Sequence, residues 1–189
     1  MTETTTLGDA RSTYYRVNGF GDDGGDSLAW VPLKIWFFTI KIPNTDGRRR
    51  AVRIHDLHHV VTGYQTDLRG EAEIGAWELA TGCLRWPAAF VLNLFALAIG
   101  IVIAPRRMAR AWARGRRTHN LYGHDGVEDL LPRQLGDVRR ELGLDAARPH
   151  VRLRDTIAVG LAALPALVVL AALVALPLAG IAALVHAIV

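Results

Sequence analysis

The strongest constraint on this chain is an apolar run at its C-terminal end. The 34 residues of Thr156–Val189 contain no Asp, Glu, Lys or Arg, and 28 of them are apolar. Such a run is long enough to cross a bilayer, whose hydrocarbon core is about 30 Å thick. As one straight helix it would measure roughly 50 Å, so we expect Pro165 or Pro177 to break it, or the helix to tilt or fold back as a hairpin. The sequence predicts a hydrophobic membrane segment over residues 151–189; a helix pair buried in a protein core is the alternative.

A second apolar stretch, Trp86–Ala104, has 19 residues and would measure roughly 28 Å as a helix. Arginines follow this stretch and also precede the C-terminal run: Arg106, Arg107, Arg110, Arg148, Arg152 and Arg154. Basic flanks stay on the cytoplasmic side of a membrane, so two spans would separate residues 55–71 from residues 119–142. We therefore predict that Trp86–Ala104 is a buried or interfacial helix and that the C-terminal run is the anchor.

The remaining composition limits the class of protein and its compartment. Hydrophobic residues make up 51% and charged residues 21% of the chain, which excludes a disordered or collagen-like protein. Cys83 is the single cysteine, so an internal disulfide and a cysteine metal cluster are excluded. The first thirty residues are polar and lack the apolar segment of a signal peptide. We therefore expect the protein in a bacterial inner (cytoplasmic) membrane, with its catalytic domain on the cytoplasmic side.

Turn and helix signals divide the chain into three parts. Residues 1–50 combine a Gly- and Asp-rich stretch, expected to be flexible through residue 28, with a strand over Trp30–Ile42. Residues 51–150 carry the helical signals, and residues 151–189 form the membrane segment. Helices are predicted over 51–62, 67–81, 87–104 with a kinked basic continuation to 117, and 125–142. The predicted fold is mainly α: a helical bundle with a short N-terminal β-like segment and a C-terminal hydrophobic membrane-anchoring helix or hairpin.

Residues at helical spacing predict a metal site. On a helix His55 and His59 lie about 40° apart, one turn above the other, and Asp56 lies about 60° from His59. Two imidazoles and a carboxylate around one patch suit a divalent metal ion. Glu71 lies in the first turn of the next predicted helix, and an antiparallel return after Gly63 would bring it back as a fourth donor. The sequence therefore predicts a site formed by His55, Asp56, His59 and Glu71.

Other interpretations of these residues stay open. A His-x-x-x-His pair is often only part of an exposed helix face that binds nothing. His58 is expected to be a neighbour of the site rather than a ligand, and Glu73 is expected to lie in solvent. Glu78, two turns after Glu71, is either an outer partner of the ligands or a solvated carboxylate.

Three other metal motifs fit this sequence less well. An HD-type phosphohydrolase needs a histidine before His55, and the chain has none. A zincin needs a glutamate where Asp56 stands. A membrane di-iron hydroxylase needs more histidines than the seven of this chain.

The spacing of the candidate ligands matches that of a known metal motif. His55-Asp56-x-x-His59 is followed by eleven residues and then Glu71, with Thr62-Gly63-Tyr64 at the intervening turn. Three later segments follow in a fixed order: Gly115-Arg116-Arg117, Asn120-Leu121-Tyr122 and Arg139-Arg140-Glu141-Leu142-Gly143. With these motifs the chain resembles the coenzyme Q (ubiquinone) biosynthesis protein 4 family over about residues 51–145. Residues 1–47 and the apolar C-terminal run lie outside the resemblance.

The resemblance implies an all-helical protein at a membrane that binds Zn²⁺, or Fe²⁺ or Mn²⁺ in its place. His55, Asp56, His59 and Glu71 would be its metal ligands and catalytic residues. It also implies a hydrophobic tunnel for a polyprenyl tail and the loss of the C1 carboxylate from a polyprenylated benzoate precursor, with hydroxylation at that carbon. The implied partners are a prenylated aromatic lipid, the membrane, other quinone-biosynthesis enzymes and further copies of the chain in a homo-oligomer.

Arginines form a basic face directly after the second apolar stretch: Arg106, Arg107, Arg110, Arg114 and Arg117. Guanidinium groups bind anionic lipid headgroups or a substrate carboxylate, and a solvated face beside a membrane segment is the alternative. We expect Arg106 and Arg110 to hold the acid group of the substrate. Nucleic acid is not an expected partner, because no nucleic-acid-binding fold accompanies the patch.

Two functions are therefore expected, the first of which is implied by the resemblance. In the first, the protein is a metal-dependent decarboxylase, a lyase acting on a prenylated hydroxybenzoate. In the second, it is a non-catalytic lipid-binding scaffold for a biosynthetic complex, and the metal is structural.

Overall fold

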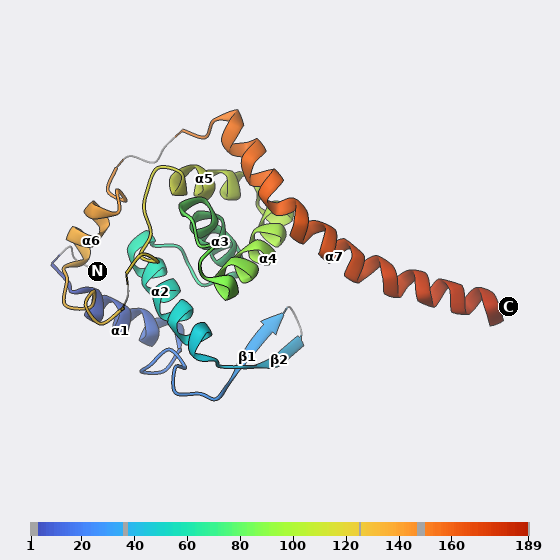
Figure 1. The fold of residues 1–189 in the computed structure, drawn as a ribbon, viewed down its shortest axis with the longest axis horizontal. Helices are drawn as coiled ribbons and strands as arrows, with labels where there is room; N and C mark the ends of the chain where they lie inside the picture. The colour runs from blue at the N-terminus through green and yellow to red at the C-terminus, as the bar shows by residue number, and fades with distance from the viewer. Residues whose placement is uncertain (1–3, 36–37, 125, 147–149, 189) are drawn as a thin grey trace.

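The fold is described by a computed structural model, which places residues 4–35, 38–124, 126–146 and 150–188. Within these ranges it has seven helices and one two-stranded antiparallel sheet (Figure 1). The predicted mainly helical fold, with a short N-terminal β segment and one long apolar C-terminal helix, is confirmed. The elements are α1 (Leu7–Asn18), β1 (Trp30–Ile35), β2 (Phe38–Pro43), α2 (Asp46–Thr62), α3 (Leu68–Thr81), α4 (Pro87–Ile103), α5 (Pro105–Gly115), α6 (Leu135–Glu141) and α7 (Leu153–Ile188).

Helix α3 lies at the centre of the bundle, in contact with α2, α4 and α5. Its residues are small or apolar on most sides, and Trp77 is completely buried. The Trp77 indole N–H donates to the Thr118 hydroxyl at 2.9 Å, so its one polar atom is satisfied. The first turns of α7 complete this part of the core with Val159, Ala163 and Ala166, while the rest of α7 extends away from the bundle (Figure 1).

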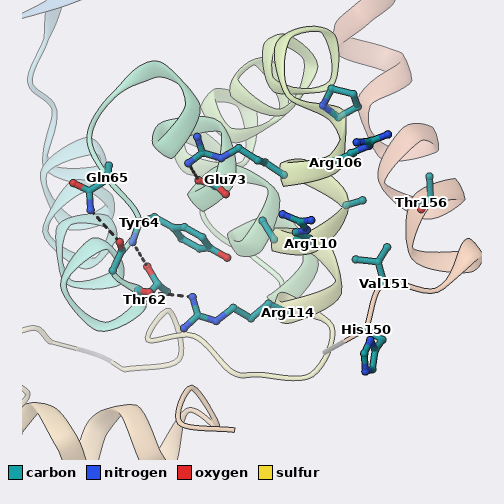
Figure 2. A pocket seen from close by; sticks show the side chains of 15 residues that line it. Thr62, Tyr64, Gln65, Glu73, Arg106, Arg110, Arg114, His150, Val151 and Thr156 are labelled. Carbon is teal, nitrogen blue, oxygen red and sulfur yellow. Dashed lines mark hydrogen bonds and ion pairs between the residues drawn. The ribbon is translucent and has the colours of Figure 1, made fainter. Parts of the chain in front are cut away.

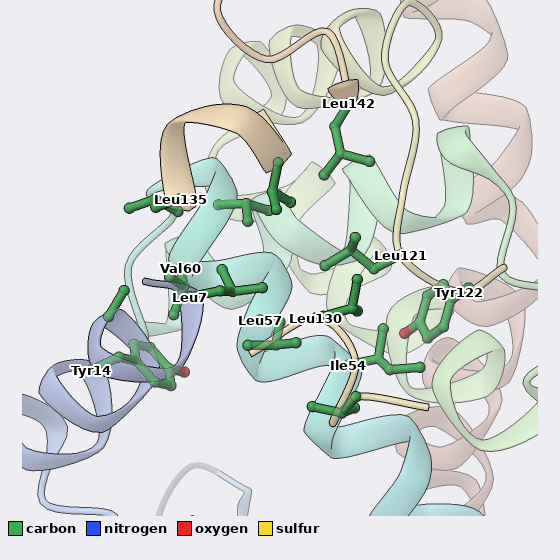
Figure 3. Close-up of a cluster of buried hydrophobic side chains, with 14 of the residues drawn as sticks. Leu7, Tyr14, Ile54, Leu57, Val60, Leu121, Tyr122, Leu130, Leu135 and Leu142 are labelled. Carbon is green, nitrogen blue, oxygen red and sulfur yellow. The ribbon is translucent and has the colours of Figure 1, made fainter. Parts of the chain in front are cut away.

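A second part of the core joins α1 and α6 to α2 (Figure 3). It consists of apolar side chains from these helices, from the segment between α5 and α6, and from the residue directly after α6: Leu7, Tyr14, Ile54, Leu57, Val60, Leu121, Leu130, Leu135 and Leu142. Because Ile54, Leu57 and Val60 occupy one face of α2, the histidines on its other faces turn toward α3.

Residues 7–18 form helix α1, which corrects the prediction of a flexible lead-in through residue 28. Helix α1 begins after Thr6, whose side chain accepts a hydrogen bond from the Asp9 N–H at 3.1 Å, and ends at Gly19 in the left-handed conformation. The backbone of Leu7 and Gly8 also bonds to the segment before α6. The prediction did not include this helix, because the glycines after Gly19 dominate the local composition.

Two further boundaries differ from the predictions. The single predicted strand is a hairpin of β1 and β2, with Trp30 opposite Pro43 and Ile35 opposite Phe38. Helix α2 begins at Asp46 rather than at residue 51, because the Thr45 side chain accepts from the Arg48 N–H and caps it. Helix α2 therefore crosses the predicted boundary at residue 50.

The helix predicted over 125–142 is much shorter. Asp125 lies outside the described residues, residues 128–132 form turns, Gln134 makes an isolated β-bridge with Thr6, and α6 starts only at Leu135. Pro132 has no N–H to donate and disfavours helix at the residue before it. The basic continuation after Pro105 is also a separate helix, α5, because Ala104 adopts an extended φ of −152° between α4 and α5.

Helix α7 runs without interruption through Pro165 and Pro177, so the predicted break and the hairpin are wrong. Each proline removes one backbone hydrogen bond, yet neither ends the helix. The most apolar 18-residue stretch within Leu153–Gly180 has a mean hydropathy of 2.7, and 17% of that stretch is buried, so the alternative of a helix buried in the core is wrong as well. By length and composition this helix could cross a membrane.

Helix α4 is shorter and partly covered by its neighbours. Asn93, Leu97 and Ala98 are buried against the bundle, whereas Val91 and Val102 are exposed. This placement agrees with the predicted buried or interfacial helix.

Replacing Gly100 by alanine is expected to lower the free energy of unfolding by about 1–3 kcal/mol. A Cβ at this position of α4 would lie 2.6 Å from the Ala72 Cβ and also meet the Met108 sulfur, where α3, α4 and α5 touch. The matched control is Gly47→Ala, because Gly47 lies in α2 with open space around it. Denaturant unfolding followed by circular dichroism in an uncharged detergent measures both variants, and equal stability of the two would contradict the close contact.

Candidate metal centre

The centre is formed by two histidines of α2 and one glutamate of α3. The Nε2 atoms of His55 and His59 lie 3.2 Å apart, and the Glu71 carboxylate lies 3.5 Å from the first and 3.4 Å from the second. The three ligand atoms lie within 4.8 Å of one another. The arrangement follows from local structure, because Gly63 ends α2 at a φ of 77° and the Asp67 side chain caps α3, so that Glu71 returns to the histidine face.

Each histidine uses its Nδ1 atom to bind an acceptor elsewhere. His55 Nδ1 lies 2.9 Å from the Glu78 carboxylate, and His59 Nδ1 lies 3.0 Å from the Tyr64 carbonyl oxygen. Carboxylates and carbonyls only accept, so both Nδ1 atoms carry the proton. Neutral rings in this tautomer point two Nε2 lone pairs at each other and at Glu71.

The two Nε2 lone pairs and the Glu71 carboxylate repel one another at these distances unless a cation lies between them. A proton can serve: burial lowers the pKa of His55, but the charges and hydrogen bonds of Glu78 and Glu71 outweigh burial and hold that pKa well above its usual value. Burial likewise raises the pKa of Glu71, and its hydrogen bonds to His55 and His59 bring it down to about 2. A divalent metal ion can take the same position, because two imidazole nitrogens and a carboxylate oxygen are a common ligand set for Zn²⁺. The group His55, His59 and Glu71 could thus hold a metal ion.

Glu78 is the buried acceptor that organises the surroundings of the centre. One carboxylate oxygen accepts from His55 Nδ1 at 2.9 Å and His58 Nδ1 at 2.7 Å; the other accepts from the Asn93 amide at 2.6 Å and the Tyr122 hydroxyl at 2.7 Å. Its side chain is completely buried. Burial raises the Glu78 pKa, but the charge of His55 and these hydrogen bonds keep it well below the usual value. Of the two sequence interpretations, the outer partner of a ligand is the one that the geometry fits.

His58 occupies the place predicted for it, as a neighbour of the group and not a member. Its Nε2 atom accepts from the Leu121 N–H at 2.9 Å while Nδ1 donates to Glu78, so the ring is fully bonded and neutral. Burial lowers its pKa, in agreement with a neutral ring.

Asp56 is not a member of the group of clustered ligand atoms. It accepts a hydrogen bond from the Tyr15 hydroxyl of α1 at 3.0 Å. Burial, opposed by the nearby charge of His55 and by this hydrogen bond, raises its pKa to about 6. The structure therefore brings together three of the four predicted ligands, and Asp56 lies beside them with its carboxylate held by Tyr15.

The arginines predicted to bind the substrate line a cavity that does not include His55 or His59. Arg106 and Arg110 of α5 lie along a cavity of about 980 Å³, together with Arg107 and Arg114 (Figure 2). His55, His59 and Glu71 are not among the described residues that line it. Glu73 is an ion-pair partner of Arg107 at its edge, with a side chain 13% exposed, which corrects the expectation that Glu73 lies in solvent.

Several residues of the centre were missed by sequence reasoning. The Tyr14 ring stacks on His59 with ring centres 5.6 Å apart, and Asn93 and Tyr122 bind Glu78. Tyr122 belongs to one of the motifs that carry the family resemblance, which was the available signal for it. Tyr14 and Asn93 had none, because their positions depend on how α1 and α4 pack.

Comparison of the chain with protein-family models, with curated proteins and with solved structures found no match.

Proposed function

We propose that this protein is a membrane-associated metalloprotein that acts on a prenylated aromatic acid in ubiquinone or related prenyl-quinone biosynthesis. The observation that supports the metal site is that the Nε2 atoms of His55 and His59 lie 3.2 Å apart and next to the Glu71 carboxylate, so that the three groups could share one ion. The resemblance of residues 51–145 to the coenzyme Q biosynthesis protein 4 family supports the substrate class. The exposed apolar surface of α7 supports a location at a membrane, and we place the bundle on its cytoplasmic side.

The protein groups have separable roles in this proposal. Glu78 and the Tyr64 carbonyl fix the rings of His55 and His59, so that both Nε2 atoms stay directed at the ion. The Tyr14 ring covers His59, whereas the Glu71 side chain is 40% exposed and leaves the group open on its own side. Bound there, a divalent ion, Zn²⁺ or alternatively Fe²⁺ or Mn²⁺, would supply a Lewis acid that polarises a carboxylate or phenolate oxygen.

The proposed reaction is loss of the C1 carboxylate from a polyprenylated hydroxybenzoate. The bond between C1 and the carboxyl carbon breaks and carbon dioxide leaves, so the electron pair remains on the ring. C1 then bonds to a proton. With dioxygen as the oxidant, the electron pair at C1 would instead bond to one oxygen atom, and addition of a proton and then of water would give the hydroxylated ring and release the second oxygen atom as hydrogen peroxide.

A non-catalytic scaffold is the second candidate, favoured by the burial of Glu78 and His58 in one network that joins α2, α3 and α4. In that case the ion holds the α2–α3 pair together. Turnover of a prenylated hydroxybenzoate by the purified protein, lost in a folded His59→Ala variant, supports the enzyme. Absence of turnover in the wild type, with unfolding on metal removal, supports the scaffold.

Mass spectrometry of co-purifying lipids tests the substrate class, and bulk phospholipid without a prenylated aromatic compound would count against it.

Substituting Leu173 by arginine is expected to weaken membrane insertion. Leu173 is 64% exposed near the middle of the apolar part of α7, and an arginine at the centre of a spanning helix costs about 2.5–3.5 kcal/mol on insertion scales. The wild type and the control Leu173→Ala should stay in the membrane pellet after alkaline carbonate extraction, whereas a larger part of Leu173→Arg should be released. Release of the wild type would show that α7 does not insert.

A further inference from the structure

The cavity along α5 carries an excess of positive charge that the proposed metal chemistry does not use. Four arginines line it, Arg106, Arg107, Arg110 and Arg114, against one carboxylate, Glu73. Glu73 pairs with Arg107, and Arg114 donates to the Thr62 carbonyl at 3.0 Å and lies over the Tyr64 ring. No hydrogen bond or ion pair to the described residues engages the side chains of Arg106 and Arg110, and both are exposed.

The start of α5 adds to this unbalanced charge. Arg106 and Arg107 lie in its first turn, at the positive end of the helix dipole, where acidic side chains are normally favoured. The helix has no acidic residue in that turn and no side-chain cap. An anion in the cavity would offset both unfavourable features.

The cavity also lies where a membrane surface would be if α7 spans a bilayer. Val151, just before α7, and Thr156, in its first turn, form the wall opposite the arginines (Figure 2). The exposed apolar surface of α7 begins beside them with Leu153 and Ile157. A lipid with its chains along α7 would therefore place its headgroup at the mouth of the cavity.

From these observations we propose that the α5 cavity binds the phosphate headgroup of an anionic phospholipid. A single arginine satisfies a carboxylate through two parallel hydrogen bonds, whereas a phosphate can be shared between the unpaired Arg106 and Arg110. The cavity volume of about 980 Å³ accommodates a whole headgroup. The proposal rests on the membrane location given above but not on the metal centre or its reaction.

Binding is measured by isothermal titration of the full chain in an uncharged detergent with dihexanoyl phosphatidylglycerol. We expect saturable binding of one lipid per chain, weakened about tenfold or more in Arg106→Gln/Arg110→Gln and changed less than about twofold in the control Arg85→Gln/Arg116→Gln. The control removes the same charge from two exposed arginines outside the cavity. Metal content should be equal in all three proteins, which keeps this test separate from that of the metal centre.

Four results would overturn the proposal. Equal affinity for dihexanoyl phosphatidylcholine would exclude selection of an anionic headgroup, and equal weakening in both double variants would indicate unspecific attraction. Inorganic phosphate bound as tightly as the lipid would point to a soluble phosphate as the ligand. Saturable binding of 4-hydroxybenzoate in place of the lipid, lost in Arg106→Gln/Arg110→Gln, would return these arginines to the substrate carboxylate.

Discussion

Purified His59→Ala protein is expected to have lost stoichiometric metal. The substitution removes one of two convergent Nε2 donors and leaves His55 and Glu71 with too few ligands for a stable site. Loss of an outer partner alone costs about 10–100-fold in metal affinity, so the affinity should fall at least about 100-fold here. Elemental analysis after dialysis, followed by titration with Zn²⁺ against a chelating dye, gives both the content and the affinity.

The matched control for this variant is His119→Ala. His119 is an exposed histidine outside the group, and its backbone N–H bonds to the Leu142 carbonyl whatever its side chain. Metal content equal to the wild type is expected for it. If His59→Ala kept a full equivalent of metal, or if His119→Ala lost it, the ion would lie elsewhere.

Glu78→Gln is expected to cause a large loss of stability. The carboxylate accepts four hydrogen bonds, from His55, His58, Asn93 and Tyr122. A glutamine presents one carbonyl oxygen and an NH₂ group, and that NH₂ group would face donors. Because the site is completely buried, the free energy of unfolding should fall by about 3 kcal/mol or more.

Glu78→Gln should also affect the metal, which distinguishes it from a substitution that only destabilises. Without a full acceptor for its Nδ1 proton, the His55 ring is no longer held in the required tautomer, and metal affinity should fall about 10–100-fold in the folded fraction. The control Glu128→Gln changes an exposed glutamate and should alter the stability by less than about 0.5 kcal/mol. Wild-type stability in Glu78→Gln would contradict the network around Glu78.

The parts of the fold that were predictable depend on short-range signals. Gly63 as the end of α2 and Pro87 as the first residue of α4 are found where the sequence predicted them, and of the two residues that could cap α3, Thr66 and Asp67, it is Asp67 that does so. Helical spacing placed His55 and His59 together, and the short turn returned Glu71 to them. These features are local because each depends on residues within a few positions of one another.

The features that the sequence did not predict depend on contacts between distant segments or on weak local signals. The cap at Thr6 and the end at Gly19 were present in the sequence but outweighed by the glycines that follow. Asp56 was assigned to the metal because of its position on α2, and nothing local indicated that the Tyr15 hydroxyl, 41 residues earlier, would hold it. The substrate role of Arg106 and Arg110 stays a prediction. The cavity that they line depends on the packing of α5 beside α7, which no short-range signal indicated.

The central claim is that His55, His59 and Glu71 bind one metal ion, and X-ray absorption at the metal edge of the full-length protein tests it most directly. The account predicts two imidazole nitrogens at about 2.0–2.1 Å, oxygen ligands at about 2.0–2.2 Å and no sulfur. The imidazole signal should decrease in His55→Ala. A shell of oxygen atoms without imidazole, or a sulfur ligand, would contradict the account.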